Sequence, residues 1–138
     1  MLPYYVAVGL GYSIVIAAAI GLMRYKSILP AYRPFIYIIL LGFLDHNLSV
    51  ILNETIRNNA VNSNIYVLLE SLLYIWFFKN LGGFFKKMTV FYFLFIFLII
   101  VWGYDNLIRN NLSTTNSLFR IVYSFVLIFL SIEQLNKA

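Results

Sequence analysis

The stretch FIYIILLGFLDHNLSVILN, residues 35–53, combines a long apolar run with three consecutive polar residues near its centre, Asp45, His46 and Asn47. Twelve of the residues from Phe35 to Leu52 are Phe, Ile, Leu or Val. Each of these favours insertion into a bilayer by about 0.3–0.6 kcal/mol, whereas a central aspartate opposes it by about 2.5–3.5 kcal/mol. The stretch is therefore predicted to be a transmembrane helix whose polar trio faces protein neighbours or a water-filled cavity rather than lipid.

The composition of the whole chain leads to the same class of protein. Of its 138 residues, 62% are hydrophobic and 11% are charged, and the mean hydropathy is +0.87, which is far from the balance of a soluble domain. The chain has no cysteine, which excludes disulfides, thiolate nucleophiles and cysteine-ligated metals. Membrane topology accounts for the net charge of +5, so we expect no nucleic-acid partner.

Five apolar runs are long enough, or nearly so, to cross a bilayer core of about 30 Å, which takes about 20 helical residues. They cover residues 4–23, 35–53, 64–81, 88–104 and 118–135. The linkers between them carry prolines, asparagines or a Gly-Gly pair, all of which end helices or favour turns. We therefore expect an all-α polytopic transmembrane helical bundle, formed by residues 1–138 as a single integral membrane domain.

Lysine and arginine alternate between the linkers, with seven on one side of the membrane and three on the other. The larger group consists of Arg24, Lys26, Arg33, Lys79, Lys86, Lys87 and Lys137, and the smaller of Arg57, Arg109 and Arg120. The positive-inside rule places the larger group in the cytoplasm. The N-terminus is then expected outside and the C-terminus in the cytoplasm.

The first span is expected to remain in the mature protein. A cleaved signal peptide is the alternative, but it needs positive charge before its apolar run, and residues 1–9, MLPYYVAVG, have none. Small residues recur in this span every four positions, at Gly9, Ser13, Ala17 and Gly21. They predict a smooth face for helix packing.

Polar residues form stripes on three of the predicted helices. The stripes are Gly42, Asp45, His46, Ser49 and Asn53 on the second span, Tyr66, Glu70 and Tyr74 on the third, and Ser117, Arg120, Ser124 and Ser131 on the fifth. In antiparallel helices with about 1.5 Å of rise per residue, Asp45 and Glu70 differ in depth by only about 3 Å, so their carboxyls are close enough to meet. Arg120 is the predicted counter-ion for Glu70 or Glu54.

Two interpretations of these stripes remain open. The polar side chains either satisfy one another as an internal lock, or they line a site, open to the outer side, for a proton, a cation or a polar ligand. The candidate residues for such a site are Asp45, His46, Ser49, Asn53, Glu70, Tyr74 and Arg120. A hydrolytic zinc site normally needs several His or Cys ligands, and the chain has one His, so we expect no metal and no other cofactor.

Three segments resemble the opening spans of uncharacterised multi-span membrane proteins common in Bacteroidota. The segments are RYKSILPAYRPFIYIILLG (24–42), NSNIYVLLESLLYIWFF (62–78) and NSLFRIVYSFVLIFLSIEQL (116–135). In those proteins a basic residue and LP precede the second span, an acid lies within it, and IY followed by Glu marks the third. The resemblance implies Asp45 and Glu70 as the recurrent intramembrane acids, and it implies a bacterial inner membrane as the location. It implies no activity. Because such proteins continue through further spans, it also implies a fragment, a shortened relative or one part of a larger assembly.

Three functional hypotheses fit these observations. The favoured one is a non-enzymatic accessory, sensor or transporter-like module that contacts membrane lipid and forms a homo-oligomer or joins a larger membrane complex. The second is an intramembrane enzyme acting on lipid, with Asp45 and Glu70 as an acid/base pair and His46 assisting. The third is a subunit that translocates protons or cations.

Overall fold

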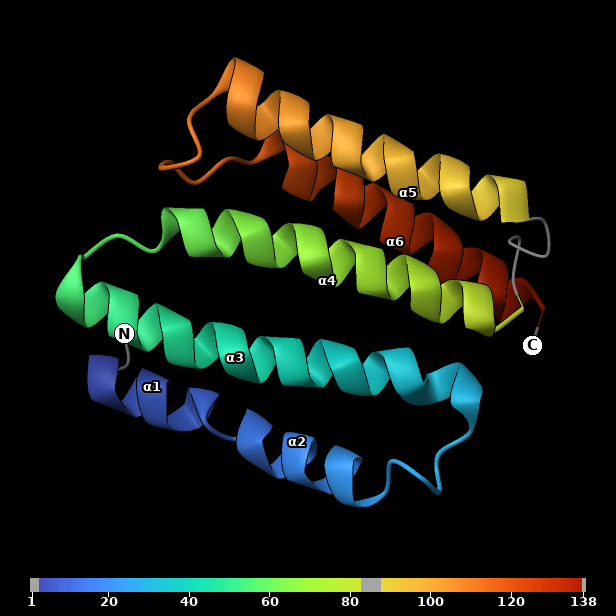
Figure 1. Ribbon diagram of the computed structural model, residues 1–138, viewed down its shortest axis with the longest axis horizontal. Helices are drawn as coiled ribbons and strands as arrows, with labels where there is room; N and C mark the ends of the chain where they lie inside the picture. The colour runs from blue at the N-terminus through green and yellow to red at the C-terminus, as the bar shows by residue number, and fades with distance from the viewer. Residues whose placement is uncertain (1–2, 83–87, 138) are drawn as a thin grey trace.

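The computed structural model describes residues 3–82 and 88–137, and within these ranges the chain forms helices joined by short loops (Figure 1). In chain order the helices are α1 (Tyr4–Gly11), α2 (Ile14–Met23), η1 (Pro30–Tyr32), α3 (Arg33–Thr55), α4 (Ala60–Asn80), α5 (Met88–Gly103), η3 (Tyr104–Arg109) and α6 (Leu118–Asn136). η3 continues directly from α5 as a π-helical turn.

Five helical stretches in the described ranges are long and apolar enough to cross a membrane. They are Tyr4–Met23, Pro30–Thr55, Ala60–Asn80, Met88–Arg109 and Leu118–Asn136. The prediction of five apolar helices is confirmed. The second and fourth stretches are longer than expected mainly because η1 and η3 add to α3 and α5, and the third begins at Ala60 rather than at residue 64.

The helices lie side by side, with α4 between α3 and α5 (Figure 1). Helices α1 and α2 run along the other side of α3, and α6 packs against both α4 and α5. Loops 56–59 and 110–117 lie at one end of the bundle, which we name the asparagine-rich end. We name the opposite end the basic end. It holds Arg24, Lys26, Arg33, Lys79 and Lys137, whereas Lys86 and Lys87 lie outside the described residues.

Residues in the left-handed conformation end two of the long helices. Arg57 follows α3 with φ 57°, and its N–H donates to the Leu52 carbonyl at 3.0 Å. Gly82 follows α4 with φ 75°, and its N–H donates to the Lys79 carbonyl at 3.1 Å. Glycine adopts this conformation freely, whereas for arginine it costs about 1–2 kcal/mol. The turn at Arg57 allows α4 to return antiparallel to α3.

The face that α2 turns toward α3 differs from the predicted small-residue stripe. Gly21 belongs both to the predicted stripe and to the face that contacts α3, because a Cβ built on it would lie 3.2 Å from Ile36 of α3. Gly9, Ser13 and Ala17 are exposed, so within this chain they do not form the contact with α3. The buried and half-buried positions on this side are Gly11, Ile14, Ala18 and Gly21. Steps of four advance a stripe by about 40° around the helix each time, whereas alternating steps of three and four keep these positions on one side.

A second packed region lies among α4, α5 and α6. Its buried side chains are Val67, Ile75, Leu98, Phe119, Tyr123 and Leu130. The outer surfaces of the same helices are apolar and exposed, with Phe93, Ile100 and Phe125 all more than 60% accessible. A helix that is apolar on its outward face suits a lipid environment. The bundle therefore consists of an α1–α2–α3 layer and an α4–α5–α6 core that meet at the α3–α4 contact.

Candidate functional site

Glu70 lies in the middle of α4, and both of its carboxyl oxygens accept hydrogen bonds from tyrosines. The Tyr66 hydroxyl donates to Oε1 at 2.9 Å, and the Tyr123 hydroxyl donates to Oε2 at 3.1 Å. Tyr66 is one helical turn away on α4, as the four-residue spacing predicts, whereas Tyr123 comes from α6. The carboxyl group is thus held between two helices. Tyr74, the other predicted neighbour, packs against the α4–α5–α6 core and makes no hydrogen bond to Glu70 within the described ranges.

Asp45 faces the first turn of α4. Its Oδ1 accepts a hydrogen bond from the Asn62 Nδ2 at 2.7 Å, and the Ser49 hydroxyl oxygen, one turn further along α3, accepts one from the Asn59 Nδ2 at 2.9 Å. Asn62 also donates to the Asn59 Oδ1 at 3.2 Å. These four side chains form a continuous polar stripe from the asparagine-rich end to Asp45.

Asp45 and Glu70 share no hydrogen bond in the part of the chain that the structure describes. The Tyr66 hydroxyl, which donates to Glu70, also lies close to α3. A Cβ built on Gly42, which lies one turn from Asp45 on α3, would be 3.7 Å from the Tyr66 hydroxyl. The carboxyl-bearing helices therefore approach each other through a tyrosine rather than through a carboxyl pair.

His46 and Asn47 point away from α4 and hold the α1–α2 segment. The His46 Nε2 lies 3.2 Å from the Val8 carbonyl oxygen, and its ring meets the Tyr12 ring edge-on with centroids 4.7 Å apart. The Tyr12 hydroxyl donates to the Asn47 Oδ1 at 3.2 Å. A Cβ on Gly11 would lie 2.1 Å from the His46 ring, so the ring occupies space that only a glycine leaves free.

The polar face predicted for α3 is therefore divided between two neighbours. Asp45 and Ser49 contact α4, and His46 contacts α1. Asn53 is exposed and lines a shallow hollow of about 220 Å³ with His46 and Ser49. The trio of Asp45, His46 and Asn47 faces protein partners, as expected, but on two sides of the helix.

Arg120 connects the start of α6 to the start of α4 through neutral groups. Its Nη2 donates to the Ser63 hydroxyl oxygen at 2.8 Å, and its Nε donates to the Asn116 carbonyl at 3.1 Å. Within residues 3–82 and 88–137 it forms no ion pair with Glu70 or Glu54, so the predicted counter-ion role is wrong. Asparagine and serine oxygens at the same end of the bundle lie nearer to the guanidinium and satisfy it.

The serine stripe of α6 does not turn inward. Ser117, Ser124 and Ser131 are exposed, and the Ser124 hydroxyl donates to the Arg120 carbonyl of its own helix at 2.7 Å. Two polar side chains of α6 that do turn inward are Arg120 and Tyr123. A hydroxyl that bonds its own helix backbone needs no partner from another helix, so the serine spacing was a poor guide to the buried face.

A second polar cluster, which the sequence pattern did not reveal, surrounds Asp105 in η3. Asp105 is fully buried, its Oδ2 accepts a hydrogen bond from the Phe119 backbone N–H at 2.9 Å, and its Oδ1 accepts one from the Asn110 Nδ2 at 3.0 Å. The Arg109 guanidinium lies 3.8 Å away. Within the described part of the chain, the Ser117 side chain, at the N-cap position of α6, makes no capping hydrogen bond. Asp105 therefore caps α6 from a distant part of the chain, where a negative charge is favoured.

Buried asparagines extend this cluster to α4. The Asn64 Nδ2 donates to the Leu112 and Thr114 carbonyls at 3.0 and 2.8 Å, and the Asn64 carbonyl accepts a hydrogen bond from the Trp102 indole at 2.8 Å. The Asn116 Nδ2 donates to the Asn106 Oδ1 at 3.0 Å. An amide both donates and accepts, so asparagine suits a closed network. In the sequence, the signal for this cluster is the pair Asp105 and Asn106, which directly follows the apolar run 88–104.

Searches against protein-family models, curated proteins and solved structures found no match for the chain. No group of three or more His, Cys, Asp or Glu residues that would hold a metal ion occurs among the residues that the structure describes.

Proposed function

We propose that the chain is a non-enzymatic, multi-pass module of a bacterial inner membrane, with the asparagine-rich end outside and the basic end in the cytoplasm. Five apolar helices with exposed apolar outer surfaces support the membrane location. The orientation is supported by charge, because five described Lys and Arg residues lie at the basic end and only Arg57, Arg109 and Arg120 lie toward the other.

In this proposal Glu70 is a proton sensor. As a carboxylate it accepts hydrogen bonds from Tyr66 and Tyr123, one on each oxygen. A protonated carboxyl carries an O–H donor of its own, and Tyr66 or Tyr123 can accept that hydrogen bond only by rotating its own hydroxyl proton away from Glu70. Because Tyr123 belongs to α6 and Tyr66 to α4, proton uptake changes the contact between these helices.

The observation that carries the proposal is this placement of one acid at mid-span between hydroxyl groups of two helices. The polar stripe of Asn59, Asn62, Ser49 and Asp45 supports an approach for protons from the outer side. The acid/base alternative has less support, because an enzyme would need Asp45 and Glu70 to face the same substrate atoms, whereas the two acids have separate hydrogen-bond partners.

Infrared difference spectroscopy of the reconstituted protein at two pH values tests the proposal, because it detects the C=O stretch of protonated carboxyls. We expect a band that is lost in Glu70→Gln, retained in Asp45→Asn and shifted in Tyr123→Phe. A pH difference spectrum that Glu70→Gln leaves unchanged would show that Glu70 takes up no proton.

A proton-flux assay in sealed vesicles separates sensing from translocation. The sensor proposal predicts that the wild-type protein and Glu70→Gln have the same proton permeability. A wild-type flux that Glu70→Gln removes would replace sensing by translocation.

A further inference from the structure

An apolar groove runs along α4 on the side away from the Glu70 hydrogen bonds. Its volume is about 490 Å³. Leu41 of α3 forms one wall and Phe91 and Phe95 of α5 form the other, with leucines and Trp76 of α4 as the floor. The α4 floor extends from Leu69 to Lys79, which at about 1.5 Å per residue gives a length of about 15 Å. The groove is thus long and apolar, and it ends at a lysine.

Lys79 carries a positive charge that no acidic side chain of the described residues neutralises. Among the described residues, the ion pairs are Arg109 with Asp105 and Lys137 with Glu133. The Lys79 Nζ instead lies over the Phe91 ring, 4.3 Å from its centroid. An aromatic ring attracts a cation but does not cancel its charge, so Lys79 remains available to an anion at the end of the groove.

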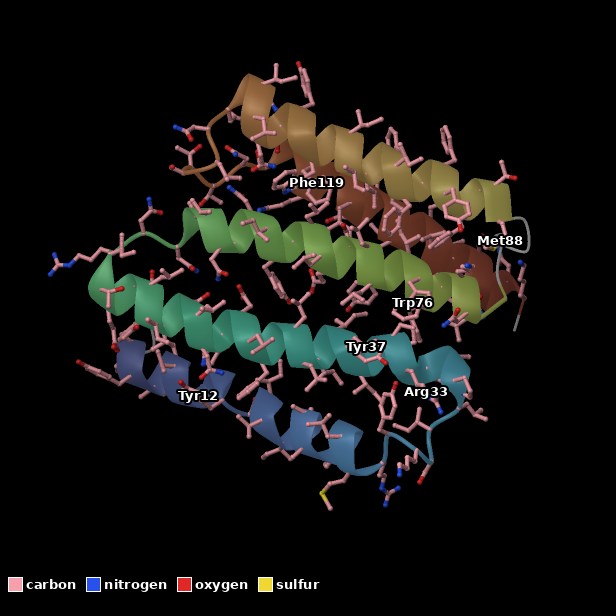
Figure 2. The ribbon with its side chains drawn as sticks, viewed as in Figure 1. Tyr12, Arg33, Tyr37, Trp76, Met88 and Phe119 are labelled. Carbon is pink, nitrogen blue, oxygen red and sulfur yellow. The ribbon has the colours of Figure 1, made fainter. Side chains whose placement is uncertain are left out.

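Aromatic and basic side chains surround this end of the bundle. Trp76 stacks on Tyr37 with ring centroids 5.8 Å apart and planes 16° apart, and the Tyr37 hydroxyl is hydrogen-bonded to that of Tyr25. Arg33 lies 5.1 Å from the centroid of the Tyr25 ring, and its buried Nε has no hydrogen-bond partner among the residues that the structure describes. Figure 2 shows Arg33, Tyr37 and Trp76 toward the same end of the molecule. Such a belt of Trp, Tyr, Arg and Lys is typical of a membrane–water interface.

We propose that this groove binds an acyl chain of an anionic phospholipid whose phosphate contacts Lys79. The apolar walls match the chain, and the unneutralised lysine at the interfacial end matches the headgroup charge. This inference rests on the membrane location in the proposed function and does not depend on Glu70.

A second copy of the chain fits the groove less well. Two copies inserted with the same orientation would bring their basic ends to the same depth. Lys79 would then meet Arg24, Lys26 and Arg33 of a like-charged partner, and like charges at close range are unfavourable. A lipid phosphate has the opposite charge.

Tryptophan quenching by brominated lipids tests the site, because bromine quenches only a tryptophan that it contacts. The chain has two tryptophans, so Trp102→Phe leaves Trp76 in the groove and Trp76→Phe leaves Trp102 as a reporter near the asparagine-rich end. If Trp102→Phe does not fold, the difference between wild type and Trp76→Phe isolates the Trp76 signal. The full chain is reconstituted with brominated phosphatidylglycerol or brominated phosphatidylcholine, and flotation with the vesicles measures membrane insertion separately.

We expect phosphatidylglycerol to bind beside Trp76 about fivefold more tightly than phosphatidylcholine, as one added charge contact implies. Lys79→Gln is expected to remove this preference. The matched control is Lys137→Gln, which removes a lysine that already pairs with Glu133 and should keep the preference. Trp102 is expected to show no preference.

Equal quenching of Trp76 by the two lipids, or a preference that survives Lys79→Gln, would overturn the lipid site. Quenching of Trp102 without any quenching of Trp76 would mean that protein covers the groove, which also overturns it. Failure of the protein to float with vesicles would instead contradict the membrane location, and the proposed function would then fail together with the lipid site.

Discussion

Asp105 and Glu70 are both acids inside the helical bundle, but different kinds of donor hold their carboxyl groups. Asp105 accepts on Oδ2 from a backbone N–H, which can only donate, and on Oδ1 from the Asn110 amide. Glu70 accepts from two tyrosine hydroxyls, which both donate and accept. The first acid is suited to a permanent contact and the second to a reversible one. The chemistry of the surrounding donors, rather than burial alone, separates a structural acid from a candidate sensor.

The largest effect is expected at Asp105. Asp105→Ala leaves the Phe119 N–H and the Asn110 amide without their partner, and we expect it to lower the free energy of unfolding by about 2–3 kcal/mol. Asp105→Asn should recover part of this loss, because its amide oxygen still accepts from Phe119. Denaturation of the purified protein in detergent measures both, with Glu133→Ala as a control acid at the basic end. Equal stability of Asp105→Ala and this control would contradict a structural role.

His46 is held in another way than Asp105. Its ring is fixed by close packing over Gly11, whereas the Asp105 carboxyl is fixed by hydrogen bonds. Gly11→Ala places a methyl group inside the His46 ring position, and we expect a destabilisation of about 1–2 kcal/mol. Gly9→Ala is the matched control, since no described atom outside the backbone of its own helix and its chain neighbours lies within 4 Å of a Cβ there and alanine favours the helix by about 1 kcal/mol. We predict that, in the same assay, Gly11→Ala lowers the free energy of unfolding and Gly9→Ala raises it. A stabilising Gly11→Ala would mean that the ring does not pack over this glycine.

A smaller effect is expected at the tyrosines that hold Glu70. Tyr123→Phe removes one hydrogen bond to the carboxylate and should cost about 1 kcal/mol in the unfolding assay. Glu70→Gln should reduce that cost, because a neutral amide accepts a weaker hydrogen bond than a carboxylate does. Tyr74→Phe should cost close to nothing, since Tyr74 makes no hydrogen bond to Glu70 among the residues described. Equal losses for Tyr123→Phe and Tyr74→Phe would remove the basis for treating Glu70 as specially held.

The local part of this architecture could be predicted from sequence. Apolar run lengths located the five helices, and the four-residue step from Tyr66 to Glu70 predicted a contact that depends only on helix geometry. Membrane insertion and orientation stay predictions. The pattern predicted one shared face for Asp45 and His46, but it did not reveal that Asp45 contacts α4 and His46 contacts α1.

Contacts between helices could not be predicted in the same way. Tyr123 reaches Glu70, and Asp105 reaches Phe119, because of how far each helix is rotated about its axis when the bundle packs. Spacing along one helix defines which residues share a face, but not which neighbour that face meets. The four-residue stripe from Gly9 to Gly21 failed for a related reason, since it winds around the helix. Asp105 lies outside the predicted spans. It caps a helix that begins 13 residues later in the chain, and such a distant cap leaves no local sequence pattern that would identify it.

The most direct test follows the protonation of Glu70 and Asp105 in the same sample. The chain has only five acidic residues, so carbon-13 NMR of labelled Asp and Glu side chains can assign each carboxyl by single substitution. We predict that in the reconstituted protein the Glu70 carboxyl signal shifts with pH while the Asp105 signal stays constant over the range in which the bundle remains folded. Glu70 and Asp105 signals that shift together, or a Glu70 signal that does not shift, would contradict the distinction between a reversible and a permanent acid.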